Sequence, residues 1–358
     1  MNLFRMSKVA FCKVKKKNRQ GLFKAVWRAM DLADWKKHVK GKKVFLKING
    51  ISDQVVPGQC TNPWVIEAVI KKLQDEIKGV EISMGDADLA ASEQLDEAAR
   101  VWGFKDLAEK YGVRFVNLSR DKLVKKKIKG KIFEELHIPK SVLDADTVIT
   151  MPVLKSHCLT HLTGALKNQW GVVPRVRHQY HLVVNQCIAD INKFLSNITF
   201  VVMDATMCME GNAPRTGVPK ECNLVIASHD RVSTDTAAAD YMDLPSEDNP
   251  MMIRAEEMGV GERKYKRVGD RVKKNPFLKP EPGKQPIFLL EMKLRKVPVI
   301  KQLIFDTPIF KFFAWGATKY NTWWWYNRKG KKYAMDVCEN SWMSRIYKPL
   351  CRRAGLKV

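Results

Sequence analysis

Short apolar segments alternate with amphipathic segments along the first two-thirds of the chain. KVFLKI at residues 43–48 is typical of a buried strand, and residues 63–77 carry apolar side chains at helical spacing. Further strands are predicted at residues 8–14, 80–84, 113–117, 146–151, 199–203 and 223–227. Further helices are predicted at residues 21–33, 92–111, 183–195 and 234–242. This alternation predicts an α/β fold with a mostly parallel sheet covered by helices.

Two segments depart from this alternation. Residues 121–138 have the pattern of two strands around Lys129-Gly130, which predicts a basic hairpin. Beyond residue 262 the chain becomes rich in Lys, Arg and Pro, like a linker or extended arm, and five of its ten tryptophans follow. We therefore predict an α/β domain over residues 1–262 and a basic, aromatic-rich C-terminal extension over residues 263–358.

The charge of the chain is strongly and unevenly positive. The 358 residues carry a formal net charge of +25. Residues 259–358 hold 24 Lys and Arg against 7 Asp and Glu, a net charge of +17. Such a balance predicts an acidic partner, either nucleic acid, an anionic membrane or a small anion. Because the excess lies mainly in the extension, catalysis and basicity are expected to belong to different parts of the chain.

The eight cysteines are scattered and form no CxxC pair. This spacing excludes the strong zinc and iron–sulfur motifs, so no built-in iron–sulfur cluster is expected. The N-terminus lacks the continuous apolar core of a signal peptide, and no uncharged apolar run reaches the ~18 residues of a spanning helix. The sequence predicts a reduced, cytoplasmic protein that is at most peripheral to a membrane.

Polar side chains follow five of the predicted strands at their carboxyl ends. In open α/β sheets ligands bind at this edge, so five such ends predict a shared cleft. Each residue alone is also consistent with an ordinary strand end, turn or helix cap. The polar ends comprise Lys47 and Asn49, Asp86 and Asp88, Lys155 and His157, Asp204, and finally Ser228, His229 and Asp230.

The segment TMPVLKSHCLTHLTGALKNQWG, residues 150–171, is predicted to be the centre of this cleft. Proline 152 lacks an amide donor and must end the preceding strand. His157 would move a proton near neutral pH, Lys155 would neutralise an anion, and Asp204 would orient His157 or hold a metal. These three are the candidate catalytic residues.

Two loops complete the predicted binding site. Residues 163–168 have the pattern of a loop entering a helix, whose free amides could bind an anion together with Lys167. Residues 210–217 place Arg215 between two glycines, as in an anion-binding loop or lid, although an ordinary tight turn has the same pattern. The candidate substrate-binding residues are Lys47, Asn49, Thr163, Gly164, Lys167, Asn168 and Arg215.

Four of the seven histidines fall within residues 157–181. His157 and His161 are four residues apart, and His178 and His181 three, so either pair could share a helical face and a divalent metal. The same residues could instead cap helices or fill polar gaps. The cofactor is therefore left open, with a divalent metal as one candidate.

Together these motifs resemble the family called domain of unknown function 362. The resemblance covers roughly residues 8–262 and rests on VFLKIN (44–49), DADTVITMPVLKSH (144–157), TGALKNQWG (163–171), EGNAPRTG (210–217) and ASHDRVSTDTAAADYM (227–242). It implies an α/β domain, in some members fused to ferredoxin-type modules whose cysteine clusters are missing here. The Lys, His and Thr-Gly pattern also looks like the amino-terminal domain of lactate racemases, where lysine and histidines serve a nickel-pincer cofactor. That likeness favours a small anionic substrate.

Two functions of different classes follow. The first is an enzyme acting on a small carboxylate or phosphate in a Lys/His/Asp cleft, with metal-assisted or redox-linked chemistry left open. The alternative is a binding protein whose basic tail docks on an anionic membrane or nucleic acid. The clustered aromatics of residues 300–325 favour the membrane interface over nucleic acid. Packing on the protein's own core, or a homo-oligomer contact, would use the same aromatics.

Overall fold

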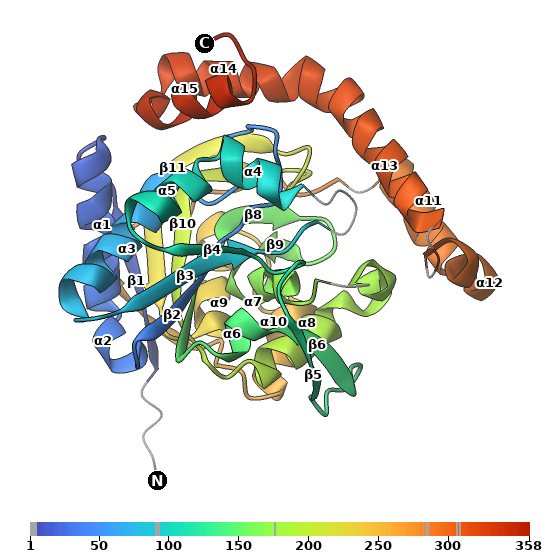
Figure 1. The fold of residues 1–358 in the computed structure, drawn as a ribbon, viewed down its shortest axis with the longest axis horizontal. Coiled ribbons are helices and arrows are strands. Elements are labelled where there is room, and N and C mark those ends of the chain that lie inside the picture. The colour runs from blue at the N-terminus through green and yellow to red at the C-terminus, as the bar shows by residue number, and fades with distance from the viewer. Residues whose placement is uncertain are drawn as a thin grey trace.

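The fold is organised around one large sheet (Figure 1). The structure, a computed structural model, describes residues 6–89, 94–174, 177–281, 283, 286–305, 307 and 309–358. The strands follow one another across the sheet as β12 (Tyr265–Gly269), β1 (Ser7–Lys13), β11 (Val218–Ser228), β10 (Ile198–Glu210), β7 (Thr147–Thr150), β2 (Lys43–Lys47), β3 (Glu81–Asp86) and β4 (Arg114–Asn117). Along this path only β11 pairs antiparallel to its neighbours, β1 and β10. The predicted α/β fold with a mostly parallel sheet is confirmed.

Two short strands extend the sheet where the site forms. After Pro152 the chain continues as β8 (Val153–His157), which pairs in parallel with β10. β8 then turns back antiparallel into β9 (His161–Thr163). The predicted basic hairpin is confirmed as a separate two-stranded sheet of β5 (Leu123–Lys127) and β6 (Glu135–Pro139).

Helices cover both faces of the sheet, because alternate side chains of its strands are buried on opposite faces. In β2, Val44 and Leu46 join one apolar cluster, whereas Phe45 joins another. The first face is covered by α1 (Arg19–Leu32), α2 (Trp35–His38), α3 (Pro63–Glu76), α4 (Leu95–Val101) and α5 (Phe104–Lys110). The second face is covered by α6 (Lys140–Leu143), α7 (Ala165–Asn168), α8 (Val184–Phe194), α9 (Arg231–Met242) and α10 (Pro250–Glu257).

Capping residues set the start of α3 and of α9. The Asn62 side chain accepts a hydrogen bond from the amide of Trp64 at 2.9 Å, and Pro63 occupies the first turn of α3. The Asp230 carboxylate accepts from the amides of Val232 and Ser233 at the start of α9. These hydrogen bonds explain why α3 begins at Pro63 and α9 at Arg231.

The C-terminal extension is helical and arches over the carboxyl edge of the parallel strands (Figure 1). Its helices are α11 (Pro286–Arg295), α12 (Pro298–Ile300), η4 (Lys301–Phe305), α13 (Ile309–Asn321), η5 (Thr322–Gly330), α14 (Lys331–Asn340) and α15 (Ser344–Arg353). The last two helices join the first apolar cluster, and the ring of Tyr347 lies edge-on to Trp102 at 6.2 Å. Part of the extension therefore packs on the α/β core.

The predicted extended arm after residue 262 is only partly present. Residues 265–269 form β12, which pairs with β1, so the sheet reaches beyond the predicted boundary. The division at residue 262 stays a prediction. Within the described residues, no helix is both long enough and apolar enough to cross a bilayer.

Candidate functional site: a basic cavity under the C-terminal helices

A cavity of about 710 Å³ lies between the carboxyl ends of β2, β3 and β8 and the C-terminal helices α11 and α13. Cationic side chains outnumber acidic ones among the residues that line it. The lining cations are Lys47, Lys155, Lys167, Arg177, Arg215 and Lys329, and the lining acids are Asp86 and Glu291. The cavity therefore has an excess of positive charge.

Lys47 is fully buried and paired with Asp86. Its Nζ lies 2.7 Å from Asp86 Oδ1 and donates to the carbonyl of Ile48 at 2.8 Å. Burial lowers the pKa of Lys47, and the charge of Asp86 opposes that change. Asn168 fixes the same corner, since its Nδ2 donates to the Lys47 carbonyl at 2.9 Å. The predicted residues Lys47 and Asn168 thus meet at the cavity, but Lys47 is already neutralised.

Lys155 is also fully buried, and its partners are neutral. Its Nζ donates to Asn49 Oδ1 at 2.6 Å and to the carbonyl of Gln59. Burial lowers the pKa of Lys155 to about 8, although the nearby Cys60, Asp86 and Asp204 raise it. Because no carboxylate contacts this ammonium among the described residues, its charge remains available to an anion in the cavity.

Lys167 stands at the same cavity without a hydrogen-bond acceptor among the described residues. The side chain is partly exposed to solvent, and it lines the cavity. Burial lowers the pKa of Lys167 well below its usual value, and the charge of Lys155 adds to this effect. The nearby hydroxyl of Thr163 is buried and also lacks a partner in the described part of the chain. Both groups are free to bind a ligand.

His157 enters the cavity as a neutral hydrogen-bond donor. Its Nδ1 accepts a hydrogen bond from the amide of Leu159 at 3.1 Å, so the ring proton must reside on Nε2. Burial, followed by the charges of Lys167, His181 and Lys155, lowers the pKa of His157 well below 6.5. The ring therefore offers an N–H to the cavity near neutral pH.

Asp204 differs from its predicted place. It lies in the middle of β10 instead of at a strand end, and it does not line the cavity. Its carboxylate accepts hydrogen bonds from the Asn62 amide at 2.8 Å and from the Thr206 amide at 2.9 Å and hydroxyl at 2.6 Å. None of the described contacts joins Asp204 to His157. Asp204 therefore holds the start of α3, and its charge reaches Lys155 only through space.

The expected anion site in the amides of residues 163–168 is wrong. The Asp235 carboxylate accepts hydrogen bonds from the amides of Ala165 at 2.6 Å and Leu166 at 3.0 Å. Gly164 lies outside the cavity lining, and a side chain there would collide with this carboxylate. Burial raises the pKa of Asp235 to about 7 despite these two hydrogen bonds. The internal carboxylate thus occupies the helix start where an external anion was expected.

The loop at residues 211–217 is the turn of the β10–β11 hairpin, and it does line the cavity. Arg215 Nη1 lies 3.5 Å from the Thr318 hydroxyl of α13. Burial lowers the pKa of Arg215, and Asp53 opposes this through its charge. The guanidinium therefore sits between the sheet edge and the C-terminal helices, and its contact with a ligand stays a prediction.

The fifth predicted strand end is wrong, because β11 runs antiparallel and ends at the opposite edge of the sheet. Ser228, His229 and Asp230 lie there, outside the cavity. The ring of His229 stacks on His38 with centroids 4.0 Å apart. Three of the five predicted polar strand ends line the cavity, and those of Asp204 and of the antiparallel strand do not.

The helical pairing expected of the histidines is also wrong for the first pair. His157 and His161 face each other across the β8–β9 hairpin, and His161 is exposed. The side chain of His178 lies outside the described residues. His181 lines the cavity, where its Nδ1 lies 3.4 Å from the Glu291 carboxylate. Among the described residues no three His, Cys, Asp or Glu side chains gather as a metal site. We therefore route no chemistry through a metal.

Two cavity residues escaped the sequence analysis. Arg177 is buried, and its guanidinium donates to the carbonyls of Trp170, Val173 and Asp88. Glu291 comes from α11; burial raises its pKa, but His181 and Arg295 outweigh that effect and hold it at about 2. Neither follows a predicted strand, so strand-end reasoning could not find them.

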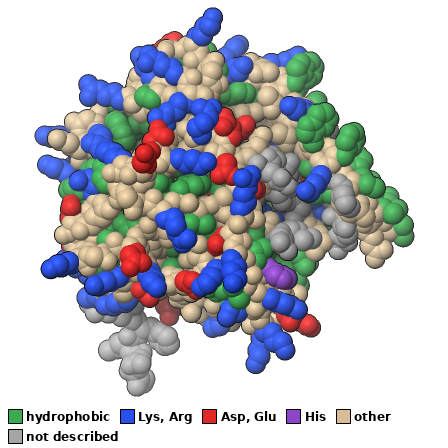
Figure 2. Space-filling view, viewed as in Figure 1, with side chains coloured by type: hydrophobic (Ala, Val, Ile, Leu, Met, Phe, Trp, Pro, Cys, Tyr) green, Lys and Arg blue, Asp and Glu red, His purple; other side chains and the backbone are tan. Residues whose placement is uncertain are grey.

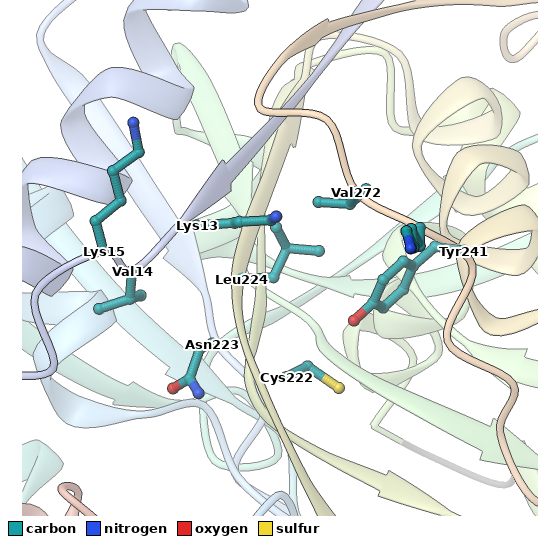
Figure 3. A pocket seen from close by; sticks show the side chains of 9 residues that line it. Lys13, Val14, Lys15, Cys222, Asn223, Leu224, Tyr241 and Val272 are labelled. Carbon is teal, nitrogen blue, oxygen red and sulfur yellow. The ribbon is translucent and has the colours of Figure 1, made fainter.

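A second, smaller cavity of about 260 Å³ shares no lining residue with the first. Figure 3 shows Lys13 and Lys15 from the end of β1, Cys222 of β11 and Tyr241 of α9 around it. The Tyr241 hydroxyl accepts a hydrogen bond from Asn275 at 3.0 Å. We assign this pocket no function.

A known family matches the central part of the chain. The family described as domain of unknown function (DUF362) matches residues 44–240. This chain belongs to that family. The resemblance stated from the motifs is thus confirmed. The match takes in β2 to α9 and every candidate catalytic and substrate-binding residue, whereas the helices α11 and α13 above the cavity lie beyond it.

Individual relatives of this DUF362 protein are more distant. The thylakoid-associated protein sll1697 of Synechocystis sp. is 28% identical over 231 residues, 62% of this chain and 69% of that protein. The lactate racemase apoprotein from Thermoanaerobacterium thermosaccharolyticum matches with a TM-score of 0.37 and 12% identity, over 66% of this chain and 56% of that one. A Thermotoga maritima protein matches with a TM-score of 0.33 and 13% identity, over 57% of this chain and 55% of that one. The chain thus spans little more than half of either solved structure.

Proposed function

We propose that this DUF362 protein is an enzyme that binds a small carboxylate or phosphate compound in the basic cavity. The observation that carries the proposal is the ammonium of Lys167, which faces the cavity without an acceptor among the described residues. A partly desolvated charge without a partner is costly. An anion placed between Lys167, Lys155 and Arg215 would remove that cost.

The interactions available to such an anion are hydrogen-bond donation and fixed positive charge. His157 presents its Nε2–H to the cavity, because the Leu159 amide occupies Nδ1. It would therefore donate a hydrogen bond to the anion, and because the ring is neutral it would not act as a proton donor. Lys155, held by Asn49, would stabilise negative charge that develops on the substrate.

Titration calorimetry with inorganic phosphate, acetate and lactate tests anion binding. Lys167→Met is expected to weaken the tightest of these ligands by at least about tenfold, since a charged hydrogen bond contributes roughly 1.5–3 kcal/mol. The matched control is Lys293→Met, which removes the same charge from an exposed position of α11 outside the cavity lining. Equal affinities for both variants, or no binding of any anion to the wild type, would contradict the proposal.

A second function, attachment to an anionic membrane surface, is favoured by the exposed face of α13 and η5. Phe312 is 70% exposed, Trp315 57% and Trp323 60%. Figure 2 shows apolar side chains gathered along the rim formed by the C-terminal helices. Lys311 and Lys319 flank them, which suits an interface where aromatics sit at headgroup level and basic residues meet anionic lipid. A relative that bears the name thylakoid-associated is consistent with this function.

Co-sedimentation with vesicles tests attachment directly. Wild-type protein is expected to bind vesicles containing anionic lipid, more weakly in high salt, and the double variant Phe312→Ser, Trp315→Ser should bind several-fold less. Leu278→Ser is the control, because Leu278 is 57% exposed but lies outside the helical extension. Failure of the folded wild type to bind anionic vesicles would refute attachment while leaving the cavity proposal intact.

A further inference from the structure

The larger cavity has two chemically different sides. Five of the six lining cations and His157 come from the sheet edge and the segments that adjoin it, Lys329 comes from η5, and α11, η4 and α13 contribute mainly apolar side chains. The apolar lining from these helices includes Leu294, Ile304, Phe310, Phe313, Ala314 and Ala317. A small hydrated anion would occupy the first side and leave the second side against water.

The apolar side continues to the molecular surface. Four large hydrophobic residues both line the cavity and are substantially exposed: Leu290 at 58%, Phe313 at 52%, Tyr320 at 41% and Trp324 at 48%. The cavity therefore opens beside the exposed apolar rim of the C-terminal helices. An apolar group could enter from that rim without crossing the cationic side.

From this juxtaposition we propose that the ligand is a single-chain amphiphile with a carboxylate or phosphate head. The head contacts Lys167 and Arg215 beside the Nε2–H of His157, and the hydrocarbon chain lies along α13 against Ala314 and Ala317. The head-group half of this inference rests on the anion binding proposed above, and the chain half rests on the apolar lining. The volume of about 710 Å³ falls within the roughly 300–1,000 Å³ of small-molecule pockets.

The chain half predicts a dependence of affinity on chain length. Each methylene group transferred from water to an apolar lining contributes about 0.8 kcal/mol, which is about a fourfold gain in affinity. Inorganic phosphate, butyl phosphate, hexyl phosphate and octyl phosphate, each below its micelle concentration, are the probes. We expect octyl phosphate to bind at least about tenfold more tightly than butyl phosphate, and neutral 1-octanol to bind more weakly than octyl phosphate.

A matched pair of variants locates the chain. Ala317→Phe fills the apolar side, whereas Gly316→Phe adds the same ring where a side chain would meet nothing within 4 Å. Ala317→Phe is expected to reduce octyl phosphate affinity to that of butyl phosphate and to leave inorganic phosphate binding unchanged. Gly316→Phe should keep the full chain-length dependence.

The outcomes separate the two proposals. If inorganic phosphate binds and longer alkyl phosphates gain nothing, the amphiphile inference is wrong and the anion site stands. If neither inorganic nor alkyl phosphate binds, the anion site itself is wrong. If chain length raises affinity equally in wild type and in Ala317→Phe, the chain binds elsewhere and the assignment to α13 fails.

Discussion

Replacing Lys167 by methionine should stabilise the folded protein even as it weakens anion binding. Methionine keeps the apolar length of the lysine stem and removes an ammonium that no described residue accepts. A fully buried polar group without a partner costs about 1–3 kcal/mol, and the variant should recover a part of that cost because Lys167 is partly buried. For a chain of this size the gain corresponds to a rise in Tm of a few degrees.

The pH dependence gives this prediction a definite sign. The folded pKa of Lys167 is lowered, whereas the unfolded chain holds the proton up to about pH 10.4. The unfolded state therefore binds more protons over that interval, and wild-type stability rises with pH there. The advantage of Lys167→Met should be largest at neutral pH and should shrink as pH approaches 10.

Denaturant unfolding of both proteins at pH 7, 8.5 and 10, without added anions, measures the difference. We compare the free energies of unfolding of the two proteins at each pH, because the titration of all other groups cancels in their difference. A destabilised variant at pH 7, or a gap that does not change with pH, would show that Lys167 has a partner in solution. The proposal of anion binding would then lose its main support, the Lys167 ammonium without an acceptor among the described residues.

Three further predictions concern other buried groups. Asp235→Asn should lower the free energy of unfolding by about 1–3 kcal/mol, because one of the two amides that donate to Asp235 loses its acceptor. The variant should also remove the loss of stability that wild type shows as pH rises from 4 to 7, because the folded pKa of about 7 exceeds the unfolded one. Burial and the neighbouring His229 lower the pKa of His38 to about 4, so wild type should lose about 1 kcal/mol as pH falls from 6.5 to 4, and His38→Phe should flatten that loss in acid unfolding curves. Gly171→Ala should lower the free energy of unfolding by about 1–3 kcal/mol, and with it Tm, because the added methyl group would collide with Asp86 at the Lys47 pair. An unchanged Tm would show that the structure around Gly171 adjusts without cost.

The sequence contained enough information for most of the sheet but not for the direction of β11. Apolar runs such as residues 43–48 identify strands because both faces of a parallel sheet are buried. The direction of β11 depends instead on the hairpin at residues 211–217, and an apolar run reads the same in either direction. That single reversal moved His229 and Asp230 to the far edge.

The candidate site was predictable to the extent that it follows strands. Lys47, Lys155 and His157 were found because each comes at the carboxyl end of an apolar run. The bond from the Asp235 carboxylate to the amide of Ala165 joins positions 70 residues apart, so no local pattern indicates that these amides are taken. Long-range satisfaction of backbone groups is what the sequence could not reveal.

Helix α13 has one side in the cavity, at Ala314, and another in solvent, at Phe312 and Trp315. A ligand in the cavity and a surface outside it would therefore both contact α13, and both would depend on the position of this helix. If a ligand binds more tightly while α13 rests on a surface, thermodynamic reciprocity requires that the ligand tighten the hold on that surface by the same factor. The fraction of protein with a filled cavity and the fraction bound to the surface would then rise and fall together.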